Sequence, residues 1–324
     1  MAEPLSMAVG RSDRTAALLD GAVGVAGFDI RCACPPYETM FTNAFTKGAY
    51  AVSELSFSNF MRLSAAGTCP YVGLPIFPSR SFRHSAWYVR PDGPVSRPED
   101  LRGRRVGVRE YAMTAAVVAR GVLAEEHGVA AREMRWVVGD VESRERDEIV
   151  PNALPEGYGI EALAPGDFLV DRLLAGEIDA LLAYKPPKAF AEGRLVRLIP
   201  DFEARERAAF ARTGVFPIMH LVGVRRDVAE AHPALPAALL AAFTEAKDIG
   251  LETLRGVQAL PVALPWLVPE VARLTALMGS DWWPYGIARN RAALASITQQ
   301  AHDQGLLPSP PAIDGLFHPS TLDS

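Results

Sequence analysis

Basic side chains gather in one short stretch of the chain, where Arg80, Arg83 and His84 fall within five residues. Two guanidiniums beside an imidazole suit an anionic ligand, because arginine binds a carboxylate through two parallel hydrogen bonds. Aromatic residues frame the stretch, and other charges do not. Surface arginines next to one structural histidine are the alternative. The pattern favours a segment in which at least one of the three contacts an anion.

Two further residues, His220 and Glu110, could handle protons. His220 lies in an apolar, strand-like run, where a lone histidine is usually a core residue; a second histidine in a cleft strengthens a functional role. Glu110 follows a predicted strand and could be a general acid if a dry cleft raises its pKa. Glu38 and Glu54 are similar candidates. Two histidines and a carboxylate could also hold a divalent metal, although their separation in sequence makes that signal weak.

The turn at 108–114 enters a predicted helix. Its backbone N–H groups and the Thr114 hydroxyl form a natural anion site, with plain helix capping by Thr114 as the alternative. Arg14 offers another cation just after the first predicted strand. Each of these groups follows a strand, so their placement depends on the order of the elements.

Strands and helices alternate along the chain, which predicts an α/β protein with a largely parallel sheet. The strands are expected at 52–56, 71–77, 85–89, 104–108, 134–138 and 178–183, and helices at 112–126, 168–175 and 288–302. Leu235, Leu239, Phe243 and Ala246 recur at helical spacing and predict a further helix with one apolar face.

Two turn-rich stretches, 91–98 and 213–217, predict connections between two lobes. We expect lobe 1 to comprise residues 1–89 and 216–324, with lobe 2, residues 90–215, inserted into it. Two-lobed α/β proteins bind ligands in a cleft at the carboxyl ends of their strands.

Composition excludes several classes of protein. The 324 residues are 49% hydrophobic and 22% charged, which is too apolar for a disordered chain. No apolar run reaches the roughly 18 residues of a membrane span. The net charge of −5 disfavours nucleic acid as a partner. Serine-hydrolase, nucleotide-driven and nicotinamide-dependent activities are disfavoured because their glycine-rich motifs are absent from the sequence.

The N-terminal residues lack the basic and apolar regions of a signal peptide, so we expect a cytoplasmic protein. Three cysteines, Cys32, Cys34 and Cys69, make no disulfide framework and are predicted to be buried thiols.

The sequence resembles the 4,5-dihydroxyphthalate decarboxylases over nearly its whole length. The most specific matches are Phe-Pro-Ser-Arg-Ser-Phe-Arg-His-Ser at 77–85 and Phe-Pro-Ile-Met-His at 216–220. Other matches lie at 13–15, 75–76, 100–108, 113–116, 176–181, 264–266 and 283–286, of which 101–108 and 176–180 are generic to the fold. The chain departs from the family pattern at Arg11 and Ser12. The resemblance implies a two-lobed type II periplasmic-binding-protein-like fold with the ligand cleft between the lobes.

The resemblance also implies an activity, the decarboxylation of 4,5-dihydroxyphthalate to 3,4-dihydroxybenzoate and CO₂ in aromatic-acid catabolism. Such a carboxy-lyase needs no cofactor, because the phenol itself supplies electrons to the ring. The implied catalytic residues are His84 as proton donor, His220 as partner of the phenol, and Glu110; exchanging the two histidines is equally consistent. The implied substrate contacts are Arg14, Ser79, Arg80, Arg83 and Thr114.

Two other functions stay open. One is a solute-binding protein that holds an aromatic carboxylate without catalysis, and the missing signal-peptide pattern disfavours it. The other is a decarboxylase that depends on a divalent metal. We expect a small aromatic dicarboxylate as the partner, with no nucleic acid and no membrane, and leave a homo-oligomer open.

Overall fold

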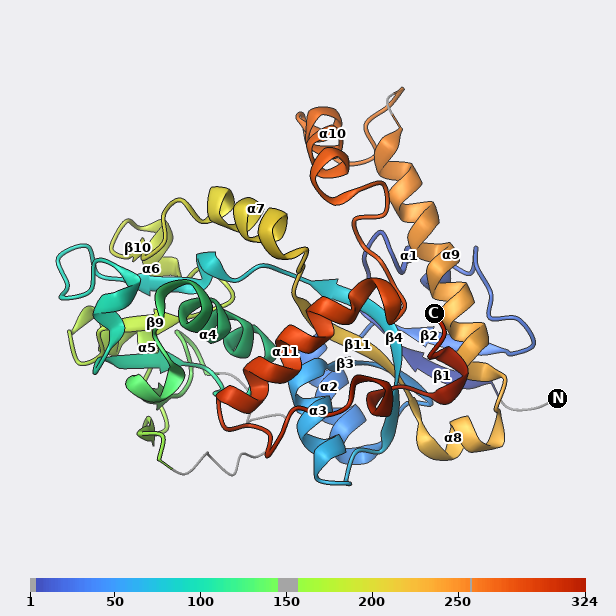
Figure 1. The fold of residues 1–324 in the computed structure, drawn as a ribbon, viewed down its shortest axis with the longest axis horizontal. Coiled ribbons are helices and arrows are strands. Elements are labelled where there is room, and N and C mark those ends of the chain that lie inside the picture. The colour runs from blue at the N-terminus through green and yellow to red at the C-terminus, as the bar shows by residue number, and fades with distance from the viewer. Residues whose placement is uncertain (1–3, 145–156, 257) are drawn as a thin grey trace. The chain divides into compact units, whose positions relative to one another are not determined.

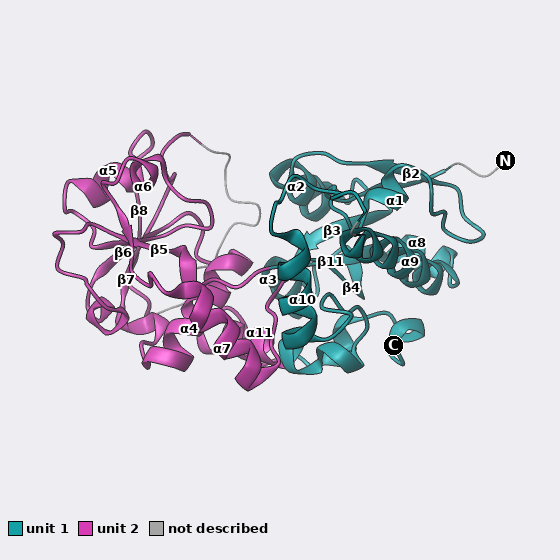
Figure 2. Ribbon diagram, turned by 90° about the horizontal axis from the view of Figure 1, so that it is seen from above, with its two compact units in different colours: residues 1–80, 220–294, 311–324 teal, residues 81–219, 295–310 magenta. Residues whose placement is uncertain are grey.

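The computed structural model describes residues 4–144, 157–256 and 258–324. The chain divides into two compact α/β units, each with its own sheet (Figure 2). Unit 1 comprises Met1–Arg80, His220–Leu294 and Pro311–Ser324, and unit 2 comprises Ser81–Met219 and Ala295–Pro310. The chain therefore passes between the units four times.

The sheet of unit 1 has five strands in the order β2-β1-β3-β11-β4 (Figure 1). The strands are β1 (Leu5–Ala8), β2 (Ile30–Ala33), β3 (Val52–Ser56), β4 (Tyr71–Arg80) and β11 (Ile218–Arg225). β1 runs parallel to β2 and β3, whereas β11 runs antiparallel to β3. Every residue of β3 is buried, as expected for a central strand covered on both faces.

Among its described residues, unit 1 has seven α-helical segments (Figure 1). They are α1 (Ala16–Leu19), α2 (Tyr37–Lys47), α3 (Phe57–Ala65), α8 (Arg226–Ala231), α9 (Leu235–Arg255), α10 (Leu267–Met278) and the first turn of α11 (Arg291–Asp303). Of these, α10 contacts α9. The predicted apolar face of α9 is buried at all four positions. At Gly250 a Cβ atom would lie 2.3 Å from the backbone oxygen of Asp13, so α9 packs directly on the segment that carries Arg14.

The sheet of unit 2 has six strands in the order β10-β5-β9-β6-β7-β8. They are β5 (Trp87–Val89), β6 (Arg105–Val108), β7 (Arg135–Val138), β8 (Ile160–Ala162), β9 (Ala180–Leu182) and β10 (Val196–Arg197). β6 is parallel to β7 and β9, and β7 is parallel to β8; only the pairs made by β5 are antiparallel among the pairs described. The helices are α4 (Thr114–His127), α5 (Leu169–Leu174), α6 (Lys188–Ala191) and α7 (Phe202–Thr213). The α/β prediction is confirmed.

The units differ from the expected lobes in three places, one of which is 216–219, expected in lobe 1 but part of unit 2. β5 was expected in lobe 1, but it pairs with β9 and β10 and belongs to unit 2. Residues 295–310 also belong to unit 2, because Gln304 accepts a 2.6 Å hydrogen bond from Arg120 Nε and Gln300 donates one of 2.8 Å to Glu125. Turn-rich stretches mark bends in the chain, whereas strand pairing decides which unit a segment joins.

One smaller expectation, three buried thiols, was wrong, and one alternative, capping by Thr114, does not hold. Cys34 is exposed and Cys32 half-buried, because they lie on or beside the edge strand β2; only Cys69 is buried as predicted. Thr114 does not cap α4, since Met113 holds the N-cap position and Thr114 is the first helical residue. The predicted loop at 142–159 lies largely outside the described residues. Within the described parts of the chain, no helix is both long enough and apolar enough to cross a membrane.

Candidate functional site

A histidine–carboxylate pair lies in unit 1, where His220 Nδ1 is 2.7 Å from Glu54 Oε1. The two residues come from neighbouring antiparallel strands. Glu54 of β3 is opposite Val222 of β11, and His220 is opposite Ser56, so both side chains project from the same face of the sheet. Glu54 is 1% exposed and His220 is 18% exposed. The sheet therefore buries the carboxylate and leaves the imidazole partly accessible.

The second oxygen of Glu54 accepts a 2.8 Å hydrogen bond from the backbone N–H of Gly10, just after β1. Gly10 in turn lies against the Tyr37 hydroxyl, and a Cβ atom at position 10 would be 2.0 Å from that oxygen. A side chain at position 10 would have to displace the Tyr37 ring from its place beside the backbone. The segment after β1 and the start of α2 therefore meet beside the Glu54–His220 pair.

Two aromatic rings of α2 contact the His220 imidazole. The Tyr37 ring centroid is 5.3 Å away, and Phe41 meets it edge to face at 4.9 Å. Burial, with a smaller contribution from the Glu54 charge, raises the pKa of Tyr37 to about 12, so its hydroxyl stays protonated near neutral pH. Within the described chain, Nε2 of His220 has no hydrogen-bond partner.

Arg14 lies near the end of β4 in the same unit. Its Nη1 is 2.5 Å from Asp13 Oδ1, and its Nε donates a 3.2 Å hydrogen bond to the Pro78 carbonyl. The guanidinium is also stacked 3.9 Å from the centroid of the Trp283 ring, and Trp283 donates its indole N–H to the Phe77 carbonyl at 2.8 Å. Arg14 is therefore held in one orientation, and 17% of its side chain is exposed.

Arg80 and Ser79 end β4. The Arg80 guanidinium is 6% exposed and donates to the Pro284 carbonyl at 2.8 Å and to the Asn290 side-chain oxygen. Burial lowers the pKa of Arg80 to about 9. These contacts fasten the segment around Pro284 to β4. Ser79 is half-buried.

In unit 2, His84 lies between two carboxylates. Its Nε2 is 3.3 Å from Glu126 Oε2 of α4, and its Nδ1 is 3.6 Å from Glu206 Oε1 of α7. His84 is 2% exposed, and burial alone would lower its pKa, but the two carboxylates outweigh burial and raise it. Glu126 also pairs with Arg212 at 3.2 Å. This cluster favours an imidazolium at His84.

Arg83 is the third arginine predicted for the site, and it lies in unit 2. It is half-buried, and its buried Nε has no hydrogen-bond partner among the described residues. Burial lowers its pKa, while the charges of Glu206 and Tyr184 act in the opposite direction. A desolvated guanidinium N–H without an acceptor is costly, and a ligand carboxylate would satisfy it.

Glu110 and Thr114 are both buried, at 5% and 3% exposure, between the end of β6 and the first turn of α4. Their neighbour Arg109 lies 3.6 Å from Asp140. The predicted site residues are therefore shared equally by the units. Unit 1 carries Arg14, Ser79, Arg80 and His220, and unit 2 carries Arg83, His84, Glu110 and Thr114.

Sequence reasoning missed the surroundings of His220. Glu54 was one of three equivalent candidate acids, and its pairing with His220 was not predicted; Gly10 and Tyr37 received no role. One signal was available: Glu54 lies inside a predicted buried strand, and a buried ionisable group needs a polar partner.

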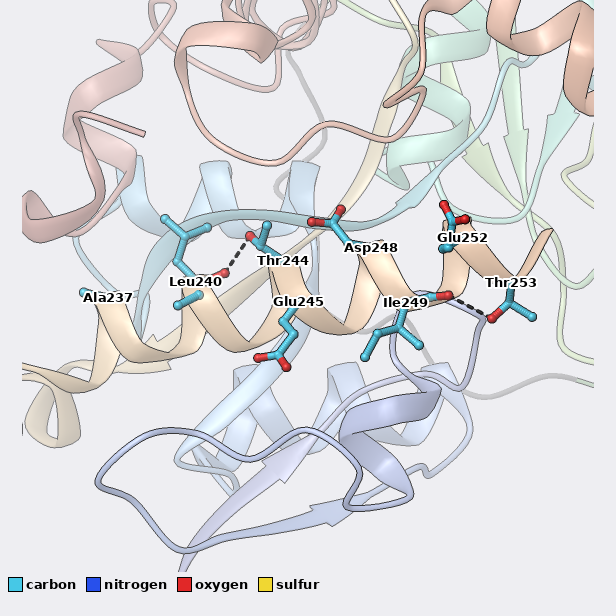
Figure 3. Close-up of a pocket in the computed structure, with 9 residues that line it drawn as sticks. Ala237, Leu240, Thr244, Glu245, Asp248, Ile249, Glu252 and Thr253 are labelled. Atoms are coloured by element: carbon cyan, nitrogen blue, oxygen red, sulfur yellow. Dashed lines mark hydrogen bonds between the residues drawn. The ribbon is translucent and has the colours of Figure 1, made fainter. Parts of the chain in front are cut away.

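A hollow of about 990 Å³ lies along the outer face of α9 (Figure 3). Its lining includes three carboxylates and none of the predicted site residues. The lining residues are Ala237, Leu240, Ala241, Thr244, Glu245, Asp248, Ile249, Glu252 and Thr253. Because three negative charges repel a carboxylate ligand, this hollow does not suit the expected substrate.

Across the described residues, no group of three or more histidine, cysteine, aspartate or glutamate side chains is arranged to hold a metal ion.

Known proteins of two kinds are similar to this chain. A 4,5-dihydroxyphthalate decarboxylase from Comamonas testosteroni is 40% identical over 324 residues, covering 99% of this chain and 98% of the relative. A 4,5-dihydroxyphthalate decarboxylase from Pseudomonas putida is 39% identical over 189 residues, or 58% of this chain and 73% of the relative. No family model matches the sequence.

Among solved structures, the periplasmic aliphatic sulphonate-binding protein SsuA of Escherichia coli matches all of this chain and all of its own, with a TM-score of 0.55 and 15% identity. The periplasmic sulfonate-binding protein of a putative sulfonate ABC transporter from Methylobacillus flagellatus covers 99% of this chain and 93% of its own, with a TM-score of 0.57 and 12% identity. At such identities the likeness concerns the fold alone, and it confirms the predicted periplasmic-binding-protein-like fold. The Comamonas relative is 40% identical over almost the full length of both sequences, and this identity shows the family. The chain belongs to the 4,5-dihydroxyphthalate decarboxylase family.

Proposed function

We propose that the protein removes one carboxylate from 4,5-dihydroxyphthalate and releases 3,4-dihydroxybenzoate and CO₂. The observation that carries the proposal is the 40% identity to a decarboxylase of that name over 99% of the chain. The sulfonate-binding proteins contribute only the fold, since both are at or below 15% identity.

The chemistry follows from the ring itself. The hydroxyl at C4 is para to the carboxylate at C1, so removing its proton raises electron density at C1. A proton adds to C1, the bond from C1 to the carboxylate breaks, and its electron pair restores the aromatic ring as CO₂ leaves. One proton is consumed overall, and no external electron acceptor is needed. The protein must supply a base, an acid and a cationic site for the retained carboxylate.

We assign the base to His220, whose Nε2 is open while Nδ1 is bonded to Glu54. The buried carboxylate stabilises the imidazolium that forms when Nε2 accepts the phenol proton. We assign the acid to His84, because two carboxylates raise its pKa and favour the protonated ring. Glu110, buried at the end of β6, is the remaining ionisable group assigned to catalysis.

For the retained carboxylate we assign Arg83 as the principal contact, because its Nε lacks an acceptor in the described chain. Arg14 and Arg80 supply further positive charge, although both guanidiniums already donate hydrogen bonds to backbone carbonyls. The Ser79 and Thr114 hydroxyls are assigned as hydrogen-bonding contacts to the substrate. Cofactor independence, a cytoplasmic location and the choice between monomer and homo-oligomer stay predictions.

Incubating the purified protein with 4,5-dihydroxyphthalate tests the activity. Chromatography should show loss of substrate matched mole for mole by 3,4-dihydroxybenzoate, and treatment with a chelator followed by dialysis should leave the rate unchanged. A rate that collapses with the chelator and returns with a divalent cation would establish metal dependence. Saturable binding of the substrate without product would establish the solute-binding alternative instead.

A further inference from the structure

We infer that Glu54 is a positioning residue that sets which nitrogen of His220 carries the proton, making Nε2 the base. The inference rests on the proposed role of His220 in the decarboxylation. It concerns a residue that the reacting atoms do not touch, because Glu54 is 1% exposed beneath the imidazole.

The argument begins with the two hydrogen bonds of the Glu54 carboxylate. The backbone N–H of Gly10 can only donate, so Oε2 is the acceptor in that 2.8 Å contact. A carboxylate is an acceptor at both of its oxygens. An ionised carboxylate has no proton to give, so the 2.7 Å contact at Oε1 requires a hydrogen on Nδ1 of His220. Neutral His220 therefore carries its proton on Nδ1 and a lone pair on Nε2.

The side chains around the His220 ring oppose a rotation that would exchange the positions of Nδ1 and Nε2. Phe41 meets the imidazole edge to face, with an interplanar angle of 80°, and Tyr37 covers it at a 55° tilt. The Tyr37 hydroxyl lies against the backbone of Gly10, in space that a Cβ atom at that position would occupy. A flip of the imidazole would have to displace the aromatic side chains of α2 and break the Glu54 bond.

Glu54 could instead serve only to join β1 to β3 through the Gly10 bond. Replacement by glutamine separates the two roles. In Glu54→Gln the side-chain oxygen can still accept from Gly10, but the amide nitrogen donates to His220 Nδ1 and forces the proton onto Nε2. The strand contact is kept while the base is lost.

Kinetics provide the first test. We expect Glu54→Gln to lower kcat by about 10³–10⁴-fold, as a wrong tautomer does in a carboxylate–histidine pair, with KM changed less than about threefold. Glu54→Asp, which keeps the charge, should recover part of the loss. The matched control is Glu230→Gln, an exposed carboxylate on α8 of the same unit, with full activity expected. Equal kcat in Glu54→Gln and the native protein would overturn the inference.

Nitrogen NMR of histidine-labelled protein provides a second test that needs no turnover. The native protein should show His220, assigned by the loss of its signals in His220→Gln, as the Nδ1–H tautomer. Glu54→Gln should show the Nε2–H tautomer. An Nε2–H signal in the native protein would refute the inference, even if Glu54→Gln fails to fold. Failure of the native protein to form product would refute the proposed function but would leave this NMR result intact.

Discussion

The two histidines to which we assign proton transfers, one in each unit, are both paired with carboxylates, but in opposite ways. His220 uses one nitrogen, for Glu54, and keeps 18% of its side chain exposed. His84 is 2% exposed and has a carboxylate within 3.6 Å of each nitrogen. One carboxylate orients an imidazole and leaves its second nitrogen open, whereas two carboxylates raise the pKa of the ring. This difference is consistent with His220 as the proton acceptor and His84 as the proton donor.

Replacing His220 should have the largest effect on activity. His220→Gln should lower kcat by about 10²–10⁴-fold, since it removes the proposed base, while the melting temperature changes little because the glutamine amide can still donate a hydrogen bond to Glu54. Steady-state decarboxylation and thermal unfolding measured on the same preparation check both parts. Activity within about threefold of the native protein would remove His220 from the mechanism.

His84→Ala tests the other half of the comparison. If His84 donates the proton to C1, kcat should fall by more than about 10²-fold while substrate affinity is kept. Calorimetric titration with 3,4-dihydroxybenzoate measures the binding separately from turnover. Unchanged turnover would show that the imidazolium only joins α4 to α7.

The arginines should affect binding more than turnover. Arg83→Gln should raise KM about 10- to 100-fold, because a charged hydrogen bond to a carboxylate contributes about 1.5–3 kcal/mol. Arg102→Gln is the matched control, since Arg102 is a half-exposed arginine of the same unit paired with Glu133. A KM that moves equally in both variants would contradict an assignment of Arg83 to the substrate.

The smallest expected effect is a pH-dependent change in stability. The folded pKa of His84 is raised above its unfolded value, so its contribution is fully present below that unfolded value and is lost as pH rises through the folded pKa. The melting temperature of His84→Gln should therefore fall furthest below that of the native protein near about pH 5.5, with the gap closing toward about pH 9. His318 provides a control of opposite sign, because burial lowers its pKa. A gap for His84→Gln that stays constant with pH would mean that its charge adds no stability.

Local features of the fold could be predicted from the sequence. The strand at 52–56 has the predicted bounds, and Gly128 ends α4 in a left-handed conformation as a stop signal should. Both features depend on residue type and near neighbours, which the sequence displays directly.

The partners of the histidines could not be predicted in the same way. Glu54 and His220 are 166 residues apart, and they meet only because β11 pairs with β3. The carboxylates around His84 come from α4 and α7, whose packing on that segment leaves no local signature. The order of strands in a sheet and the packing of helices depend on the whole core. The sequence could therefore indicate candidate residues but could not indicate which of them contact one another.

The four passages of the chain between the units have a consequence for how each unit is completed. In unit 2, the buried guanidinium of Arg120 donates a hydrogen bond to Gln304, which comes much later in the sequence. In unit 1, β4 is bridged at Gly73 by Phe317, and His318 donates its backbone N–H to the Gly73 carbonyl at 2.9 Å. Each unit is therefore completed by residues that follow most of both sheets in the sequence, so neither unit is made of one continuous N-terminal segment.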